Sequence, residues 1–110
     1  MTDTVLVNSD QNTAPETIEV FYTANTAGAG TLITSFTASN NTTSSSWYRA
    51  YIYDSTGNPL PAIVPLKIVS RDRYDLGPPI VGQLIPPGGT LRMETSDASS
   101  IAYRVTGDEL

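Results

Sequence analysis

The stretch Trp47-Tyr48-Arg49-Ala50-Tyr51-Ile52-Tyr53-Asp54 is the part of the sequence that most directly indicates the fold. Side chains alternate along it, with Tyr48, Ala50 and Ile52 on one face and Trp47, Arg49, Tyr51 and Tyr53 on the other. A period of two residues is typical of a β-strand, because successive side chains point to opposite faces of a sheet. Since both faces carry aromatic rings, we expect one face to pack in the core and the other to contact a neighbour.

Similar short strands are expected on both sides of this stretch. They fall at residues 16–23, 31–39, 80–85, 90–95 and 101–106, and at residues 60–69, where Pro61 and Pro65 suit an edge strand or an irregular crossing. Turn residues separate the strands roughly every ten positions. About seven or eight short strands at this spacing predict a single antiparallel β-sandwich, jelly-roll or immunoglobulin-like, over residues 16–110.

The alternation also predicts which side chains form the core of this sandwich. Thr, Val and Ile are abundant, and these β-branched residues pack well on a pleated surface. The expected core consists of Ile18, Val20, Tyr22, Leu32, Phe36, Ile52, Leu91, Met93, Ile101, Tyr103 and Val105.

Residues 1–15 are expected to form an N-terminal arm and linker. The short apolar run Val5-Leu6-Val7 is followed by a polar run that ends at Pro15. An isolated apolar segment of this kind can add to the open sheet edge of a partner and bury its side chains there. The competing interpretation makes residues 5–7 the first strand of the domain's own sandwich.

Composition excludes several classes of function. The chain has 110 residues, a formal net charge of -5, and neither Cys nor His. It lacks the cationic stripe of a nucleic-acid binder, and an anionic membrane surface would repel it. Ser-His-Asp and Cys-His triads cannot be built, nor can thiolate or histidine zinc sites. We expect no enzyme activity, no cofactor and no metal.

The remaining carboxylates show no spacing that specifies chemistry. Asp54, Asp72, Asp75 and Glu94 do not form an evident acid–base pair. Asp72 and Asp75 lie close enough in sequence to suggest calcium, but they lack the alternating ligands of a calcium loop. Local ion pairing with the neighbouring arginines is favoured over a calcium site.

Three groups of residues are candidates for a partner interface. The first is the apolar run near the N-terminus, and the second is the outward aromatic row, which suits either a subunit contact or a sugar-stacking platform. The third is the charged cluster within residues 70–79. The predicted interface residues are Val5, Leu6, Val7, Trp47, Tyr51, Tyr53, Arg71, Arg73 and Tyr74.

Several segments together resemble a known group of proteins. The chain runs from Phe21-Tyr22-Thr23-Ala24 through Gly30-Thr31-Leu32-Ile33-Thr34-Ser35-Phe36-Thr37-Ala38-Ser39-Asn40-Asn41-Thr42 to a Pro-Gly turn and Thr90-Leu91-Arg92-Met93, and it closes on Val105-Thr106-Gly107-Asp108-Glu109. This order is similar to small all-β virion structural proteins of tailed bacteriophages. The resemblance covers about residues 16–110, and its motifs are made of strand and turn residues. Residues 60–79 depart most from it.

The resemblance implies a structural part of a virion, assembled in the cytoplasm of the bacterial host. Members of the group are head decoration proteins or tail and fibre-base components. The favoured expectation is a capsid decoration or cement protein that binds the major capsid protein as a homo-oligomer, with a trimer favoured. The alternatives are a tail or fibre-base component and a carbohydrate-binding module.

Overall fold

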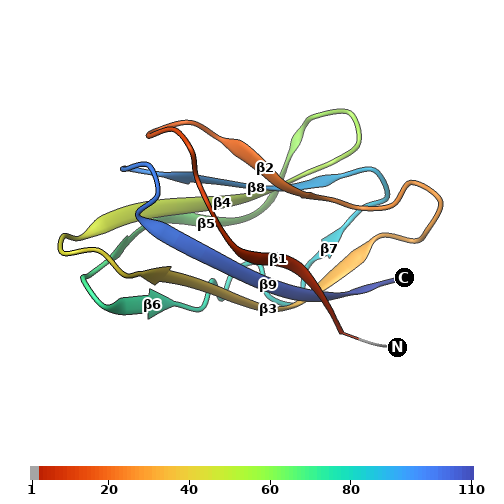
Figure 1. Ribbon diagram of the computed structural model, residues 1–110. Coiled ribbons are helices and arrows are strands. Elements are labelled where there is room, and N and C mark those ends of the chain that lie inside the picture. Colours follow the sequence, from red (N-terminus) through yellow and green to blue (C-terminus); the bar gives the residue numbers. More distant parts are fainter. Residues whose placement is uncertain (1–2) are drawn as a thin grey trace.

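The fold is an all-β sandwich, as the sequence predicts. A computed structural model describes residues 3–110, apart from the side chain of Ala62. These residues form strands and no helix (Figure 1). The strands are β1 (Thr4–Gln11), β2 (Glu19–Thr23), β3 (Thr31–Asn40), β4 (Ser46–Tyr53), β5 (Pro59–Val69), β6 (Arg73–Asp75), β7 (Leu84–Ile85), β8 (Thr90–Thr95) and β9 (Ile101–Glu109).

Two antiparallel sheets form the layers of the sandwich. The first has the order β1-β9-β3-β6, with β7 also pairing with β3, and the second has the order β2-β8-β4-β5. Alternating residues of β4 and β8 turn inward, since their burial alternates along both strands. The inward and outward faces expected for residues 47–53 are therefore confirmed.

Three aromatic rings form the centre of the core. Phe36 comes from β3, Tyr48 from β4 and Tyr103 from β9, so the group joins both sheets. The ring centroids of Phe36 and Tyr48 lie 5.8 Å apart, and that of Tyr103 lies 6.2 Å and 6.0 Å from them. These spacings lie within the range in which aromatic pairs attract beyond their apolar burial.

Each buried tyrosine hydroxyl has a partner on a different strand or connection. Tyr103 donates to Oδ1 of Asn12 at 2.8 Å, and Nδ2 of Asn12 donates to the carbonyl oxygen of Met93 at 2.9 Å. Tyr48 donates to a carboxylate oxygen of Asp75. Asn12 thus joins the two sheets on the side of β1 and β2, and Asp75 joins them on the side of β5 and β6.

The N-terminal segment belongs to the sandwich, so the prediction of a separate arm is wrong for residues 4–11. They form β1, which pairs with β9, and Val7 lies opposite Val105. Val7 is only 1% exposed because its side chain enters the core. The polar run that suggested a linker supplies Asn12, which is buried and hydrogen-bonded. Met1 and Thr2 of the predicted arm lie outside the described residues.

Seven of the predicted core side chains are buried, namely Phe36, Ile52, Leu91, Met93, Ile101, Tyr103 and Val105. The prediction is wrong for Ile18 and Val20, which are 40% and 53% exposed, and Tyr22 and Leu32 are half-buried.

Register shifts explain these differences. One shift lies between Val20 and Tyr22 in β2, where Phe21 packs against the core. Another lies between Ile33 and Ser35 in β3, so Ile33 replaces Leu32 in the core. A β-bulge inserts one residue and reverses the alternation beyond it.

The central region also differs from the expected strand boundaries. Residues 70–79, expected as a loop, contain the short strand β6, and the strand expected at residues 80–85 is reduced to β7. Two turns precede β7. In these turns the amide of Ile80 donates to the carbonyl of Gly77, and the amide of Gln83 donates to the carbonyl of Ile80. As expected, β5 with its prolines is an edge strand.

Replacement of Phe36 by alanine is expected to destabilise the protein by about 3–5 kcal/mol, because the ring is 2% exposed and its loss leaves a cavity. Denaturant unfolding measures this change. The matched control is Thr37→Ala on the outward face of the same strand, for which a loss below about 1 kcal/mol is expected. Equal losses for the two variants would contradict the assignment of faces in β3.

Deletion of residues 1–12 is expected to lower the melting temperature strongly. The deletion removes β1 and Val7, and it leaves the buried hydroxyl of Tyr103 without its acceptor, which alone costs about 1–3 kcal/mol. Calorimetry measures the change. The control Val5→Ser alters an exposed side chain of the same strand and is expected to stay within about 0.5 kcal/mol of the parent. A deletion variant as stable as the parent would show that β1 contributes nothing to the sandwich.

Candidate functional site

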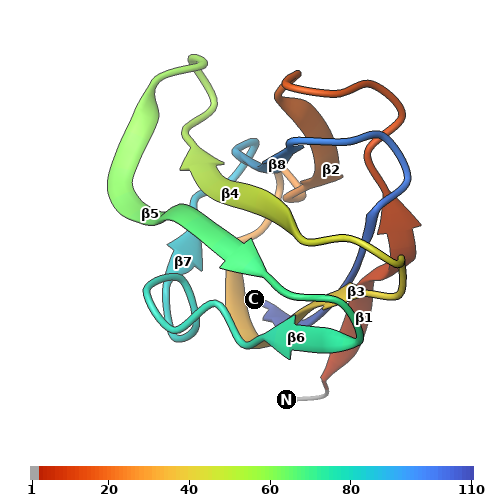
Figure 2. The ribbon, with the colours of Figure 1, turned by 90° about the vertical axis from the view of Figure 1, so that its left-hand side faces the viewer.

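One side of the sandwich is open. We call it the open side: here β5, an edge strand of one sheet, faces β6 and β7 at the edge of the other (Figure 2). Two neighbouring clefts lie between these elements, and Pro79 lines both. The first cleft has a volume of about 440 Å³ and the second about 290 Å³.

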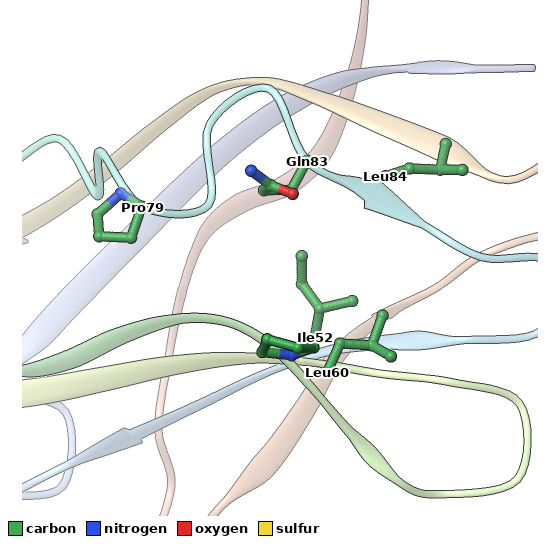
Figure 3. A pocket seen from close by; sticks show the side chains of 6 residues that line it. Ile52, Leu60, Pro79, Gln83 and Leu84 are labelled. Atoms are coloured by element: carbon green, nitrogen blue, oxygen red, sulfur yellow. The ribbon is translucent and has the colours of Figure 1, made fainter.

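The first cleft has apolar walls contributed by both sheets. Figure 3 shows Ile52 and Leu60 on one wall and Pro79, Gln83 and Leu84 on the other. Pro61 completes the lining. Gln83 is the only polar side chain among these six, so the cleft is suited to apolar groups of a partner.

The second cleft adds charge to the same apolar character. Val64, Leu66 and three prolines line it together with Lys67 and Asp75. Asp75 also accepts the hydrogen bond from Tyr48, which fixes this wall against the core. The loop that follows needs a glycine, because Gly77 has a φ of 55° and a side chain there would come within 2.5 Å of the Phe36 ring.

Exposed apolar side chains concentrate in the segment that runs from β5 to β7. Ten large apolar side chains are exposed in residues 3–110, and six of them fall between residues 66 and 84. The six are Leu66, Ile68, Tyr74, Leu76, Val81 and Leu84. Leu66 and Leu84 line the two clefts, and exposed apolar side chains at a cleft are typical of an interaction site, whereas scattered ones are not.

The outward face of β4 and β8 is a second candidate surface, which we call the aromatic face. It consists of Trp47, Arg49, Tyr51, Tyr53, Arg92 and Glu94. Arg92 lies 4.1 Å from the centroid of the Tyr53 ring, and Arg49 lies 5.6 Å from that of Trp47. Such cation–π contacts hold the guanidinium groups close to the rings.

The opposite outer face of the sandwich is different in character. Its outward positions on β3 and β9 carry Ser35, Thr37, Ser39, Arg104 and Thr106. Apart from Arg104, these are small hydroxyl side chains, which suit contact with water, whereas half-buried aromatic rings are enriched at protein interfaces. The contrast identifies the aromatic face, and not its opposite, as a surface that can bind another molecule.

The structure places the nine predicted interface residues in separate regions. Val5, Leu6 and Val7 lie on β1, whereas Arg73 and Tyr74 lie on β6, at the opposite edge of the same sheet. Trp47, Tyr51 and Tyr53 lie on the aromatic face of the other sheet. Val7 is buried, so its side chain cannot contact a partner, while Val5 and Tyr74 are exposed.

The two acidic residues considered for calcium have separate partners. Asp72 lies 3.5 Å from Arg71 in an exposed ion pair, as the local ion-pairing interpretation expects, and Asp75 is bound by Tyr48. Sequence reasoning did not identify the walls of the clefts. The closely spaced prolines at positions 61, 65, 78 and 79 were the available signal, because proline cannot continue a hydrogen-bonded ladder.

The described part of the chain shows neither a metal-binding cluster nor a membrane-spanning helix. Within residues 3–110, no group of three or more acidic, histidine or cysteine side chains is placed to hold a metal ion. Those residues also contain no helix long and apolar enough to cross a membrane. Comparisons with known protein families, curated proteins and solved structures find no match to this chain. The clefts and the aromatic face are therefore the features of this protein that bear on its function.

Alkaline pH is expected to unfold the protein through its buried phenols. Burial raises the pKa of Tyr48 and of Tyr103, and the hydrogen bond to Asp75 adds to the rise at Tyr48. In the unfolded chain a phenol ionises near pH 10. The contribution of these two neutral phenols to the free energy of unfolding is therefore complete below about pH 10, and it is lost as the pH rises further.

A spectrophotometric titration tests this expectation. Phenolate absorbance from Tyr48 and Tyr103 should appear together with loss of the far-ultraviolet strand signal. In the variant Tyr48→Phe, the absorbance change that accompanies unfolding should correspond to one phenol fewer. Ionisation of all six tyrosines while the strand signal persists would contradict the burial of these two hydroxyls.

Proposed function

We propose that this protein is a non-enzymatic structural protein of a bacteriophage virion that binds another virion protein through its open side. A capsid decoration or cement protein bound to the major capsid protein is the favoured role. A tail or fibre-base component is the alternative. The observation that carries the proposal is the concentration of exposed apolar side chains over residues 66–84, of which Leu66 and Leu84 line the two clefts.

The sheet edges support a contact made by side chains. Register shifts interrupt β1 and β2, β6 has three residues, and β5 contains Pro61 and Pro65. Bulges, short strands and prolines at an edge discourage a further strand from pairing there. A partner is therefore bound through clefts and faces, and the chain does not extend into a continuous sheet.

The resemblance to virion proteins supports the biological setting of the proposal. The segments that carry it form the edge strand β2 and the inner strands β3, β8 and β9. Residues 60–79, which depart from the resemblance, line the second cleft. A sandwich that departs from the group at its open side suits a module that attaches to one particular partner.

Self-association is a separate part of the proposal. Tyr51 and Tyr53 lie at the centre and one end of the aromatic face, with ring centroids 6.2 Å apart. Covering these rings with a second copy removes apolar surface from water, which favours association. A trimer is the expected state, on the grounds of the resemblance, and light scattering of the full chain measures it.

The double variant Leu66→Ser, Leu84→Ser is expected to weaken attachment to virions of the phage that carries the gene. Each leucine is worth about 1.5 kcal/mol or more when it becomes fully buried, so the pair should change the affinity at least about a hundredfold. Co-sedimentation of the purified protein with virions that lack it measures the effect.

Val20→Ser is the matched control, since Val20 is exposed on β2, at the other edge of its sheet. Quantitative mass spectrometry of virions distinguishes the two roles, because a decoration protein is present in enough copies to cover the head and a tail component in only a few. Absence of the protein from purified virions would overturn the proposal. Equal weakening by the control and the double variant would show that the open side is not the contact.

A further inference from the structure

A third cleft lies beside the only tryptophan of the sequence, at the end of the aromatic face. It has a volume of about 280 Å³ and is lined by Ser45, Ser46, Trp47, Ile68, Ser96 and Asp97. Trp47 and Ile68 are opposite each other on β4 and β5, so they form an apolar wall. The serine hydroxyls and the Asp97 carboxylate form a polar wall. A cleft with one apolar and one polar wall matches a ligand that has both kinds of surface.

The polar wall is held in place by hydrogen bonds. Oδ2 of Asp97 accepts from the hydroxyl of Ser46 at 3.2 Å and from that of Ser96 at 3.1 Å. No donor among the described residues reaches its other oxygen, Oδ1. The Ser96 hydroxyl also accepts from the amide of Trp47 at 3.0 Å, which ties this wall to the ring. Oδ1 is thus an oriented acceptor that remains free for a ligand.

The backbone of this turn is fixed as well. The amide of Ser96 donates to the carbonyl of Trp47 at 3.0 Å, and the carbonyl of Asp97 accepts from the hydroxyls of Thr95 and Ser100 at 2.9 Å and 2.8 Å. Because these groups are already ordered, a ligand need not pay the entropy of ordering them.

The other rings of the aromatic face do not provide a flat stacking surface. The rings of Tyr51 and Tyr53 meet at 69°, and Arg92 lies over Tyr53 at 4.1 Å, which is closer than Arg49 lies over Trp47, at 5.6 Å. Trp47 lies about 20 Å along the strand from Tyr53, given a rise of about 3.3 Å per residue. Trp47, Tyr51 and Tyr53 were the rings expected to stack on a sugar. Of these three, Trp47 lines the cleft and is therefore the stacking surface.

Charges of opposite sign stand on the two sides of the cleft, so a ligand with a net charge of either sign is attracted by one and repelled by the other. Arg49 lies 5.6 Å from the centroid of the Trp47 ring and repels a cation that approaches it. Asp97 repels an anion on the opposite wall. We propose that this cleft binds one neutral sugar residue, which stacks its apolar face on Trp47 and donates hydroxyl hydrogen bonds to Oδ1 of Asp97. This site is separate from the clefts of the open side.

Fluorescence of the full chain tests the proposal directly, because Trp47 is its single tryptophan. The probes are maltotriose, cellotriose and the trimer of N-acetylglucosamine, each titrated to the millimolar range. At least one is expected to change the emission saturably. The tetramethylammonium ion and glucuronate are the charged comparisons and are expected to leave the emission unchanged.

Variants test the contribution of each wall of the cleft to binding. Asp97→Asn keeps the fluorescent ring and removes the carboxylate, and it is expected to weaken binding at least tenfold. Trp47→Ala, followed by calorimetry with the same trisaccharide, is expected to abolish binding. Val20→Ser, on β2 at the other edge of this sheet, should bind as the parent does. Melting temperatures of the variants establish that each is folded.

Three outcomes would overturn the sugar assignment. The first is no saturable change with any of the three trisaccharides, and the second is saturable binding of a charged probe in their place. The third is equal weakening by the Val20→Ser control. None of these results bears on attachment through Leu66 and Leu84, so a failure here is distinguishable from a failure of the proposed function.

Discussion

The structure depends on two tyrosine hydroxyls that are buried between the sheets. Tyr48 and Tyr103 pack against Phe36 at the centre of the core, and each ring brings a polar group out of water. A buried hydroxyl without a partner costs more than a hydrogen bond contributes, so both must be satisfied. Asn12 and Asp75 satisfy them from opposite sides of the sandwich. This requirement fixes the position of the segment after β1, which carries Asn12, and of β6, which carries Asp75.

The hydrogen bonds to Asn12 and to Asp75 have different consequences for the surface. Asn12 is itself buried, and it donates to Met93 of the second sheet, so the side of β1 and β2 is closed. Asp75 is only half-buried and stands at the mouth of a cleft. A tyrosine hydroxyl is therefore bound by a buried acceptor on one side of the sandwich and by a half-buried acceptor on the other. The surfaces suited to partners lie on the second side and on the adjoining aromatic face.

The sequence predicted the fold class and the faces of β4, β8 and β9 because these strands keep a regular alternation. It did not predict the faces of β2 and β3, since a bulge at Val20–Tyr22 or Ile33–Ser35 reverses the alternation without any sign in residue type. The same reasoning found Trp47 and the outward tyrosines. It could not find the clefts, because their walls come from β5 and from residues 75–84, which meet only in three dimensions.

The pairing of β1 with β9 has a topological consequence. Thr4 lies opposite Gly107, so the two ends of the sandwich are hydrogen-bonded neighbours at one end of the molecule (Figure 1). A linker of a few residues can close the backbone into a ring, and the exposed turn at Thr56–Gly57 is then a natural place to reopen it. Such a circular permutant keeps every strand pairing of the sandwich and moves both new ends to the turn between β4 and β5. The order of the strands along the chain is thus separable from their order in the sheets.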